Sequence, residues 1–415
     1  MNRRRFLWTS ATSFALACCK PLSAQTGAAT LEPWREGLLD IHHISTGRGN
    51  SVLIVCPDGT SIMVDAGAIS ESSQGIGPAR PNSSRRPGEW IAQYALQHLP
   101  AASRPQLDYF ILTHFHIDHM GEVTAASPLA TAGGYHLTGV TDVAEVLPIR
   151  RLLDRGFPAY NYPAPLTDAS VLNYIRFANF ASQHGTTVEP FRAGSSTQVA
   201  PKHGTAKSTA WNVQNLAANG TVWTGKGEET VNLFPDPGKL KPEEFPTENA
   251  CSLALRLSYG DFSYYIGGDL TCDTNYGTTP WMDVESPVAK VAGPVNVSAL
   301  DHHGYYDATC PAFVRAMRSR VYIMQTWHAS HPALSVLNEL YSPILSPGAH
   351  DVFATGLLPA ASVADSRLSS KMLSQHGHVV VRVSAGGARY EVIVLDDTTE
   401  QTSVLARTGP YLSRV

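Results

Sequence analysis

The amino-acid sequence predicts a mixed fold of the α+β class. Short apolar runs bounded by turn residues recur along the chain, and helix-like segments separate them. The 415 residues are 43% hydrophobic and 16% charged, a composition that can bury a large core. Because no apolar run reaches about 18 residues, we expect no transmembrane helix in the mature chain.

The individual elements follow from these runs. Apolar residues flank a Pro-Asp-Gly turn at 57–59, and similar pairs of runs flank 259–261 and 386–387. The predicted elements are hairpins at 53–67, 252–266 and 377–395, single strands at 107–112 and 297–300, and helices at 89–98, 170–182 and 336–340. The pattern by itself supports mixed strands and helices and no more specific architecture.

Four metal-ligand side chains are packed into six residues directly after the predicted strand at 107–112. They are His114, His116, Asp118 and His119. A single histidine at a strand end is usually a polar residue whose hydrogen bonds are satisfied by its surroundings. Four such side chains in six residues are hard to explain in this way, because a solvated loop has no need of so many and a packed core could not hydrate them. Imidazole and carboxylate together suit zinc or a similar divalent ion. The segment therefore predicts a metal site.

The pattern His114-x-His116-x-Asp118-His119 resembles the signature of the metallo-β-lactamase superfamily. The resemblance implies a four-layer αββα sandwich of two mainly antiparallel sheets with helices outside. It also implies two metal ions, the first bound by His114 and His116 and the second by Asp118 and His119. Two ions about 3.5–4 Å apart can polarise a substrate oxygen and generate a hydroxide together.

Three further landmarks of that family occur in order along the chain. Asp65 matches a structural aspartate near the metal loop. Asp269 matches the carboxylate that bridges both metals, and the glycines before it allow close backbone approach. The pair His302-His303 contains the last ligand, and we assign His303 as the ligand and His302 as a group that faces the substrate or supports the ligands.

Within the superfamily, several motifs resemble one branch, which contains the hydrolase domain of the competence DNA-uptake channel and the pneumococcal phosphorylcholine esterase. These motifs are Gly-Arg-Gly-Asn-Ser at 47–51, Gly-Gly-Asp-Leu at 267–270, His-His-Gly at 302–304, and His331-Pro332 before the helix at 336–340.

One position departs from many superfamily members, which supply another histidine just before the strand that leads to the bridging aspartate. Here that place holds Asn249. The first metal would then be held by His114, His116 and Asp269. Three protein ligands with an open position are what catalytic zinc requires. We expect Asn249 to orient substrate or water.

One catalytic domain is expected at 30–415, with a long segment at 126–247 between the metal loop and the second half of the site. Because that segment far exceeds an ordinary connection, we interpret it as a folded insertion or substrate lid. Four of its aromatic residues are candidates for a pocket lining, with core packing as the alternative: Tyr160, Tyr162, Trp211 and Trp223.

The amino terminus carries a run, Asn-Arg-Arg-Arg-Phe-Leu-Trp at 2–8, that matches a twin-arginine export motif. We expect residues 1–24 to be a removable signal peptide, which places the mature protein in the periplasm or outside the cell. Folding before export suits a metal protein, because metal binding and folding are coupled. The alternatives are a basic amphipathic first helix and lipid attachment at Cys18.

The charge balance bears on the substrate. Removal of residues 1–24 takes away three arginines and one lysine, which moves the formal net charge from −4 to −8. An acidic protein is not a natural sequence-independent binder of nucleic acid. We therefore expect a small-molecule or cell-envelope substrate and no nucleic-acid partner.

The cysteines outside the expected signal peptide are Cys56, Cys251, Cys272 and Cys310. If the loops after Asp269 and His303 adjoin the same metals, a disulfide between Cys272 and Cys310 is geometrically feasible, and an oxidising compartment would permit it. Four buried free thiols are an equal alternative.

The preferred function is an exported hydrolase with two zinc ions, for which manganese or iron are alternatives. We expect a metal-bound hydroxide to attack a phosphomonoester or phosphodiester, with Asp269 and the ions holding the nucleophile. Asp118 is counted with both the ligands and the catalytic residues. His302, His331 and Asn249 are candidates to stabilise the developing charge or to protonate the leaving group.

Three alternatives stand beside this function. The same metal pair serves hydrolysis of an amide, lactam or lactone. A non-catalytic cell-envelope binding protein is the second, which the intact ligand set disfavours. A redox role of the flavodiiron type is the third; it needs an iron pair and normally a flavin partner, and no flavin-binding segment is recognisable.

Overall fold

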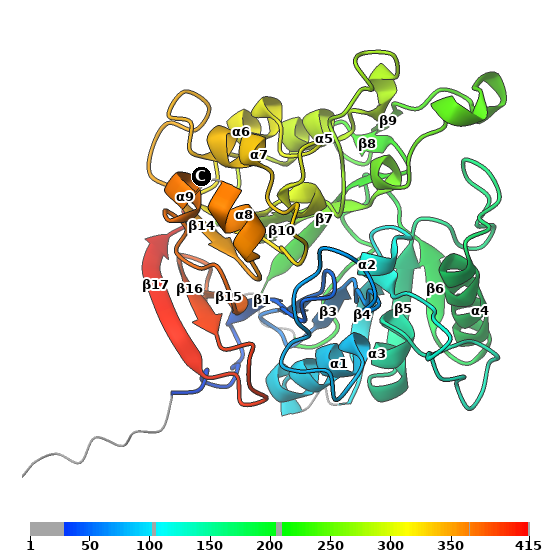
Figure 1. Cartoon of the computed structure of the whole chain (residues 1–415), viewed down its shortest axis with the longest axis horizontal. Coiled ribbons are helices and arrows are strands. Elements are labelled where there is room, and N and C mark those ends of the chain that lie inside the picture. Colours follow the sequence, from blue (N-terminus) through cyan, green and yellow to red (C-terminus); the bar gives the residue numbers. More distant parts are fainter. Residues whose placement is uncertain (1–28, 102–104, 205–209, 365, 414–415) are drawn as a thin grey trace, which may run out of the picture.

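The computed structural model describes residues 29–101, 105–204, 210–364 and 366–413. These residues form four layers in the order helices, sheet, sheet, helices (Figure 1). The α+β sandwich expected from the sequence is therefore confirmed. The expected signal peptide at 1–24, with Cys18, lies outside the described residues.

The first sheet has the strand order β17-β16-β15-β1-β2-β3-β4-β5-β6 over the described residues. Its strands are β1 Leu39–His43, β2 Val52–Val55, β3 Ser61–Val64, β4 Leu107–Ile111, β5 Ile149–Asp154, β6 Thr187–Pro190, β15 His378–Val383, β16 Arg389–Leu395 and β17 Val404–Leu412. Pairing is antiparallel from β17 to β3 and parallel from β3 to β6. The parallel pairing of β3 with β4 brings the loops after both strands to one edge.

The second sheet has the order β14-β13-β12-β11-β10-β7-β8-β9 over the described residues. Its strands are β7 Trp211–Ala218, β8 Thr221–Trp223, β9 Thr230–Asn232, β10 Ala254–Tyr259, β11 Phe262–Ile266, β12 Val297–Ala299, β13 Val321–Met324 and β14 Asp351–Ala354. Strands β11 to β14 pair in parallel and the remaining pairs are antiparallel. Each sheet thus joins an antiparallel half to a parallel half, instead of being uniformly antiparallel.

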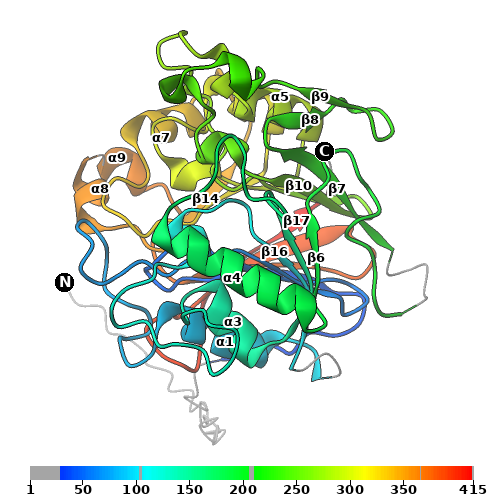
Figure 2. The same cartoon turned by 90° about the vertical axis from the view of Figure 1, so that its right-hand side faces the viewer.

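Helices cover the outer faces of both sheets, as the views in Figures 1 and 2 show. Against the first sheet lie α1 Pro87–His98, α3 Val140–Val146 and α4 Ala169–Gln183. Against the second lie α5 Glu285–Ala292, α6 Pro311–Met317, α7 Leu334–Leu340, α8 Pro359–Ala364 and α9 Ser366–Ser369. Within the described ranges, none of the helices has the length and apolar character needed to cross a bilayer.

The strands that are easiest to recognise in the sequence are buried on both faces. In β2, Val52 and Ile54 face the core between the sheets, whereas Leu53 and Val55 face the helices. Such strands read as continuous apolar runs because neither face meets water. The three predicted hairpins are confirmed as the antiparallel pairs β2–β3, β10–β11 and β15–β16.

The segment 126–247, expected as an insertion or lid, contributes strands to both sheets. Strands β5 and β6 extend the parallel half of the first sheet, and β7 pairs with β10 in the second. The segment is long because parallel strands need helical crossovers, which α3 and α4 supply. Most of it therefore lies inside the sandwich, in place of a separate insertion. Its four aromatic candidates all pack against the hydrophobic cores: Tyr160, Tyr162, Trp211 and Trp223.

Candidate metal centre

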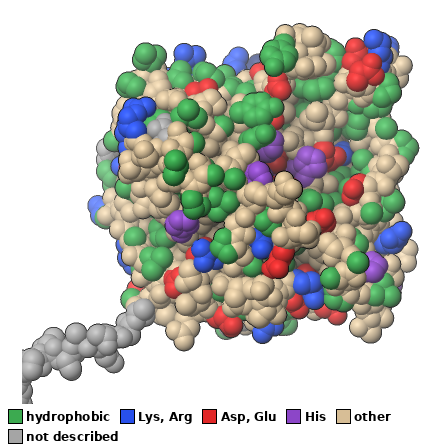
Figure 3. All heavy atoms as spheres, viewed as in Figure 1, with side chains coloured by type: hydrophobic (Ala, Val, Ile, Leu, Met, Phe, Trp, Pro, Cys, Tyr) green, Lys and Arg blue, Asp and Glu red, His purple; other side chains and the backbone are tan. Residues whose placement is uncertain are grey.

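The histidines and aspartates singled out in the sequence gather where strand ends from the two sheets meet. The loop after β4 supplies 114–119, the loop after β11 supplies Asp269, and the turn after β12 supplies His302 and His303. In Figure 3, histidine side chains lie together near the centre of the face shown, beside acidic side chains. The fold therefore brings residues more than 180 positions apart into one cluster.

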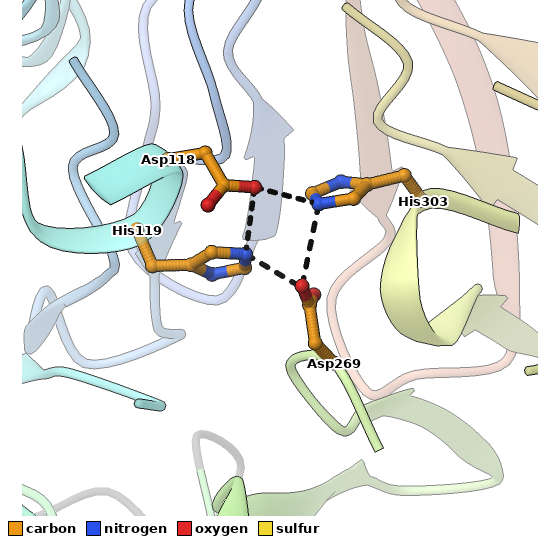
Figure 4. A group of neighbouring side chains, drawn as sticks. All are labelled: Asp118, His119, Asp269 and His303. Atoms are coloured by element: carbon orange, nitrogen blue, oxygen red, sulfur yellow. Dashed lines mark hydrogen bonds and ion pairs between the residues drawn. The ribbon is translucent and has the colours of Figure 1, made fainter. Parts of the chain in front are cut away.

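Four buried side chains form the first group: Asp118, His119, Asp269 and His303. Figure 4 shows them pointing toward one another from the one-turn helix α2 (Ile117–Met120), the loop after β11 and the turn after β12. His303 Nε2 lies 2.8 Å from Asp118 Oδ2, and His119 Nε2 lies 3.1 Å from Asp269 Oδ1. One candidate ligand atom from each of the four lies within 4.8 Å of the others.

The second group contains His114, His116 and Asp269, whose candidate ligand atoms also lie within 4.8 Å of one another. His114 Nε2 is 3.1 Å from His116 Nδ1 and 3.6 Å from Asp269 Oδ2. His114 and Asp269 are buried, whereas His116 is exposed. Asp269 is common to both groups, so it occupies the position expected of a bridging carboxylate, and the second group opens toward solvent.

In two of these histidines, the ring nitrogen that points away from the cluster already forms a hydrogen bond within the protein. His119 Nδ1 lies 2.8 Å from Asp65 Oδ2, and His303 Nδ1 lies 3.1 Å from the carbonyl oxygen of Gln325. A carboxylate and a carbonyl only accept, so each Nδ1 must carry a proton and donate it. The Nε2 atoms therefore face the cluster, which is how metal-binding histidines are usually oriented.

This orientation tests whether the cluster fits a metal ion. In its neutral form His119 presents a lone pair at Nε2 to Asp269 Oδ1, so two acceptors face each other. Both atoms are buried, and among the described residues neither has a hydrogen-bond partner. Buried polar atoms without partners are rare, and a cation placed between the two acceptors, either a proton on Nε2 or a metal ion, satisfies both. The donor set of imidazoles and carboxylates therefore fits a divalent ion.

The pKa shifts of the clustered residues also favour a bound cation. Burial opposes the shift, but Asp269, Asp118 and Asp65 raise the pKa of His119 well above its usual value. Burial likewise opposes the shift at His303, whose pKa the carboxylates of Asp269 and Asp118 raise to about 9. Burial would raise the pKa of Asp269, yet the surrounding imidazoles, His119 first, hold it well below its usual range. Burial would also raise the pKa of Asp118, yet His119 and His303 hold it well below its usual range. The carboxylates of Asp118 and Asp269 are thus ionised and attract positive charge into the cluster.

Backbone conformation explains why glycine and a strained turn occur here. His302 and His303 have positive φ angles of 45° and 58°. This left-handed conformation costs an L-residue about 1–2 kcal/mol, and such strain gathers at functional sites. At Gly67 a Cβ atom would lie 1.9 Å from the carbonyl oxygen of Asp118. Glycine at that position is therefore required for the close approach that fixes the metal loop.

Three polar side chains surround Asp269 and His303. His302 Nδ1 donates to Asp307 Oδ1 at 2.6 Å, which leaves Nε2 3.3 Å from Asn249 Nδ2 and 3.8 Å from Asp269 Oδ2. The ring of His331 stacks on that of His303 with centroids 4.6 Å apart. Burial lowers the pKa of His331 well below its usual value, so the ring is neutral. The structure therefore places His302, Asn249 and His331 beside the cluster, and their catalytic roles stay predictions.

Two residues beside the cluster escaped the sequence interpretation. Asp307 orients His302, and Glu248 accepts the backbone N–H of Phe115 in the metal loop at 2.7 Å. Asp307 lies in a loop that carries no apolar pattern, and Glu248 acts on a residue 133 positions away. No local signal identifies either role, because both depend on how distant loops meet.

Part of the chain matches a known family. The family model described as the metallo-beta-lactamase superfamily matches residues 44–136, a range that contains β2, β3, β4 and the loop at 114–119. No curated protein matches the chain. The family match and the cluster of histidines and aspartates together support a metal-dependent hydrolase with a candidate metal site of several residues.

Proposed function

We propose that the protein is an exported, zinc-dependent hydrolase of phosphoester or phosphodiester bonds. The observation that carries the proposal is a set of polar side chains that adjoins the cluster of histidines and aspartates. His302 Nε2 lies 3.8 Å from Asp269 Oδ2, Asn249 Nδ2 lies 3.3 Å from His302 Nε2, and the ring of His331 stacks on that of His303. A phosphoryl group presents several charged oxygens at once, and several converging polar groups suit it better than the single oxyanion of an acyl substrate.

The metal ligands in this proposal are the two groups that share Asp269. His114, His116 and Asp269 would hold one divalent ion, and Asp118, His119, Asp269 and His303 the other. Imidazole and carboxylate ligands suit zinc and also admit manganese or iron. When bound, two such ions supply Lewis acidity toward a substrate oxygen and lower the pKa of a water molecule.

The residues of the chain supply proton transfer and orientation. Asp307 accepts from His302 Nδ1 and stabilises the charged imidazole, so His302 can carry a proton at Nε2 and give it to the leaving oxygen. The amide of Asn249 donates from Nδ2 to His302 Nε2 at 3.3 Å while that nitrogen is unprotonated, and can donate to a phosphoryl oxygen once Nε2 carries a proton. His331 stacks on His303 and keeps that ring in place.

Sequence features outside the site complete the proposal. The twin-arginine run at 2–8 supports export, and the charge of −8 after loss of residues 1–24 disfavours nucleic acid as substrate. The motifs at 47–51, 267–270 and 302–304 resemble a branch that includes a phosphorylcholine esterase, which also favours a phosphoester. A small molecule or a component of the cell envelope is therefore the substrate class we propose.

The substrate class is tested with the purified protein after zinc loading, with two zinc atoms per chain expected by elemental analysis. The panel is bis(p-nitrophenyl) phosphate, p-nitrophenyl phosphate, a chromogenic β-lactam and a lactone. We expect turnover of the phosphoesters that a chelator abolishes and added zinc restores. Turnover of only the lactam or lactone would replace the phosphoester proposal by the acyl alternative. Full metal content with no turnover of any substrate would favour a binding protein.

The proton-donor role of His302 predicts a dependence on the leaving group. Replacing His302 by glutamine should lower kcat by about 10²–10⁴-fold for an aryl-alkyl phosphodiester whose alkoxide must be protonated as it leaves. The loss should be much smaller for p-nitrophenolate, which leaves without a proton. The matched control is Asp307→Asn, which should show the same selectivity more weakly. Equal losses for both leaving groups would assign His302 to orientation only.

A further inference from the structure

Two cysteines from different loops lie together on the outer side of the metal cluster. Cys272 is three residues after Asp269, and Cys310 caps the start of helix α6. Their sulfur atoms and a carboxylate oxygen of Glu285 lie within 4.8 Å of one another. Both thiols are partly exposed, whereas Cys56 and Cys251 are buried. Solvent-borne reagents can therefore reach this pair and not the other two described cysteines.

The backbone segments that carry the pair are already hydrogen-bonded to each other. The carbonyl oxygen of Asp307 accepts the backbone N–H of Cys272 at 2.9 Å, the hydroxyl of Thr271 at 2.8 Å and the thiol of Cys272 at 3.3 Å. A disulfide forms only where the backbone places two Cβ atoms close together, and these hydrogen bonds favour that arrangement by holding the Cys272 loop beside the loop that leads to Cys310.

The surroundings favour a bond between the two sulfur atoms over a further metal site formed by Cys272, Glu285 and Cys310. Both oxygens of Glu285 already accept backbone N–H groups, from Thr309 at 2.5 Å and from Cys310 at 3.1 Å. The carboxylate thus holds the loop before α6. The neighbouring thiol of Cys272, and a contact with the hydroxyl of Ser286 at 3.4 Å, lower the pKa of Cys310 against the effect of burial. The more acidic thiol of such a pair is the usual attacking group.

We propose that Cys272 and Cys310 form a disulfide that ties the loop after Asp269 to the loop that carries Asp307. The bond arises by exchange with a small-molecule or protein disulfide. The thiolate of Cys310 attacks one sulfur of that oxidant and releases a thiol. The thiolate of Cys272 then attacks the mixed disulfide and releases the second thiol. Two S–H bonds are lost, one S–S bond forms, and the two electrons and two protons pass to the oxidant.

The bond would act on the metal cluster through Asp307. The carboxylate of Asp307 holds His302, and its carbonyl oxygen holds the Cys272 loop. A covalent link between 272 and 310 therefore restricts the motion of the residue that orients His302. Any effect of the disulfide on turnover rests on the proposed hydrolase function, but the existence of the bond does not.

The test uses the full chain treated either with oxidised glutathione or with dithiothreitol. Remaining thiols are blocked with N-ethylmaleimide and peptides are mapped without reduction. We expect a linked peptide pair containing Cys272 and Cys310 in the oxidised sample, and alkylation of both in the reduced sample. The melting temperature should be higher by about 5 °C in the oxidised form. This difference should vanish in Cys272→Ser and in Cys310→Ser, while Cys56→Ser should retain it.

Several outcomes would overturn the proposal. One is alkylation of both cysteines after oxidation, and another is glutathione attached to each with no linked peptide. A third is the loss of one zinc atom per chain in the reduced Cys272→Ser variant, which would assign the pair to a metal site. Because peptide mapping needs no substrate, the disulfide can be confirmed even if every hydrolysis assay fails.

Discussion

Replacing Asp269 by alanine is expected to lower metal binding at both ligand groups and to reduce hydrolysis by at least about 10³-fold. The reason is that the Asp269 carboxylate lies between three histidine side chains. Oδ1 lies 3.1 Å from His119 Nε2, and Oδ2 lies 3.4 Å from His303 Nε2 and 3.6 Å from His114 Nε2. Without this carboxylate, three imidazoles face one another around a buried space that has lost its shared anion.

The measurement pairs elemental analysis with turnover on the same sample. The matched control is Asp261→Ala, which removes the exposed aspartate at the other end of β11 and should keep metal content and activity. A conservative Asp269→Asn variant keeps the shape of the side chain without its charge, and should also lose metal. Full metal and full activity in Asp269→Ala would exclude a bridging role for this residue.

The parts of this protein that the sequence predicts well are those with a local signal. The ligand loop at 114–119 is a contiguous motif, and the strands beside it are continuous apolar runs because both faces are buried. Asp269 and His303 could be assigned because each lies in a short motif after a recognisable strand, and both motifs resemble those of the superfamily. These local signals were enough to place every predicted ligand in one cluster.

The edge strands show why the rest was not predictable. Strand β9 is exposed along its length, and most of β17 is exposed as well. A strand at the edge gains its conformation from pairing with a neighbour, so burial leaves little pattern in its sequence. The segment 126–247 was interpreted as an insertion because of its length, and its strands pair with sheet members that lie far away in the sequence.

Long-range polar contacts give no local signal either, and the pair Arg155–Glu248 is the clearest case. Arg155 follows β5, and Glu248 precedes β10 by six residues. The Arg155 side chain donates Nε to Glu248 Oε1 at 2.7 Å and a terminal nitrogen to Oε2. The same Oε1 accepts the N–H of Phe115, and the guanidinium lies over the Phe115 ring. This pair therefore ties the metal loop to the segment that carries Asn249.

Replacing Arg155 by alanine is expected to lower the free energy of unfolding by about 3–5 kcal/mol, because it leaves the carboxylate of Glu248 without its buried partner. Arg151, which lies in the strand β5 that Arg155 follows, offers a matched control. Arg151 also pairs with a glutamate, Glu189, but the side chains are 26% and 19% exposed, against 1% and 17% for Arg155 and Glu248. Arg151→Ala should therefore cost no more than about 1 kcal/mol. Urea unfolding of both variants at neutral pH makes the comparison, and equal losses would show that the buried pair has no special role in holding the metal loop.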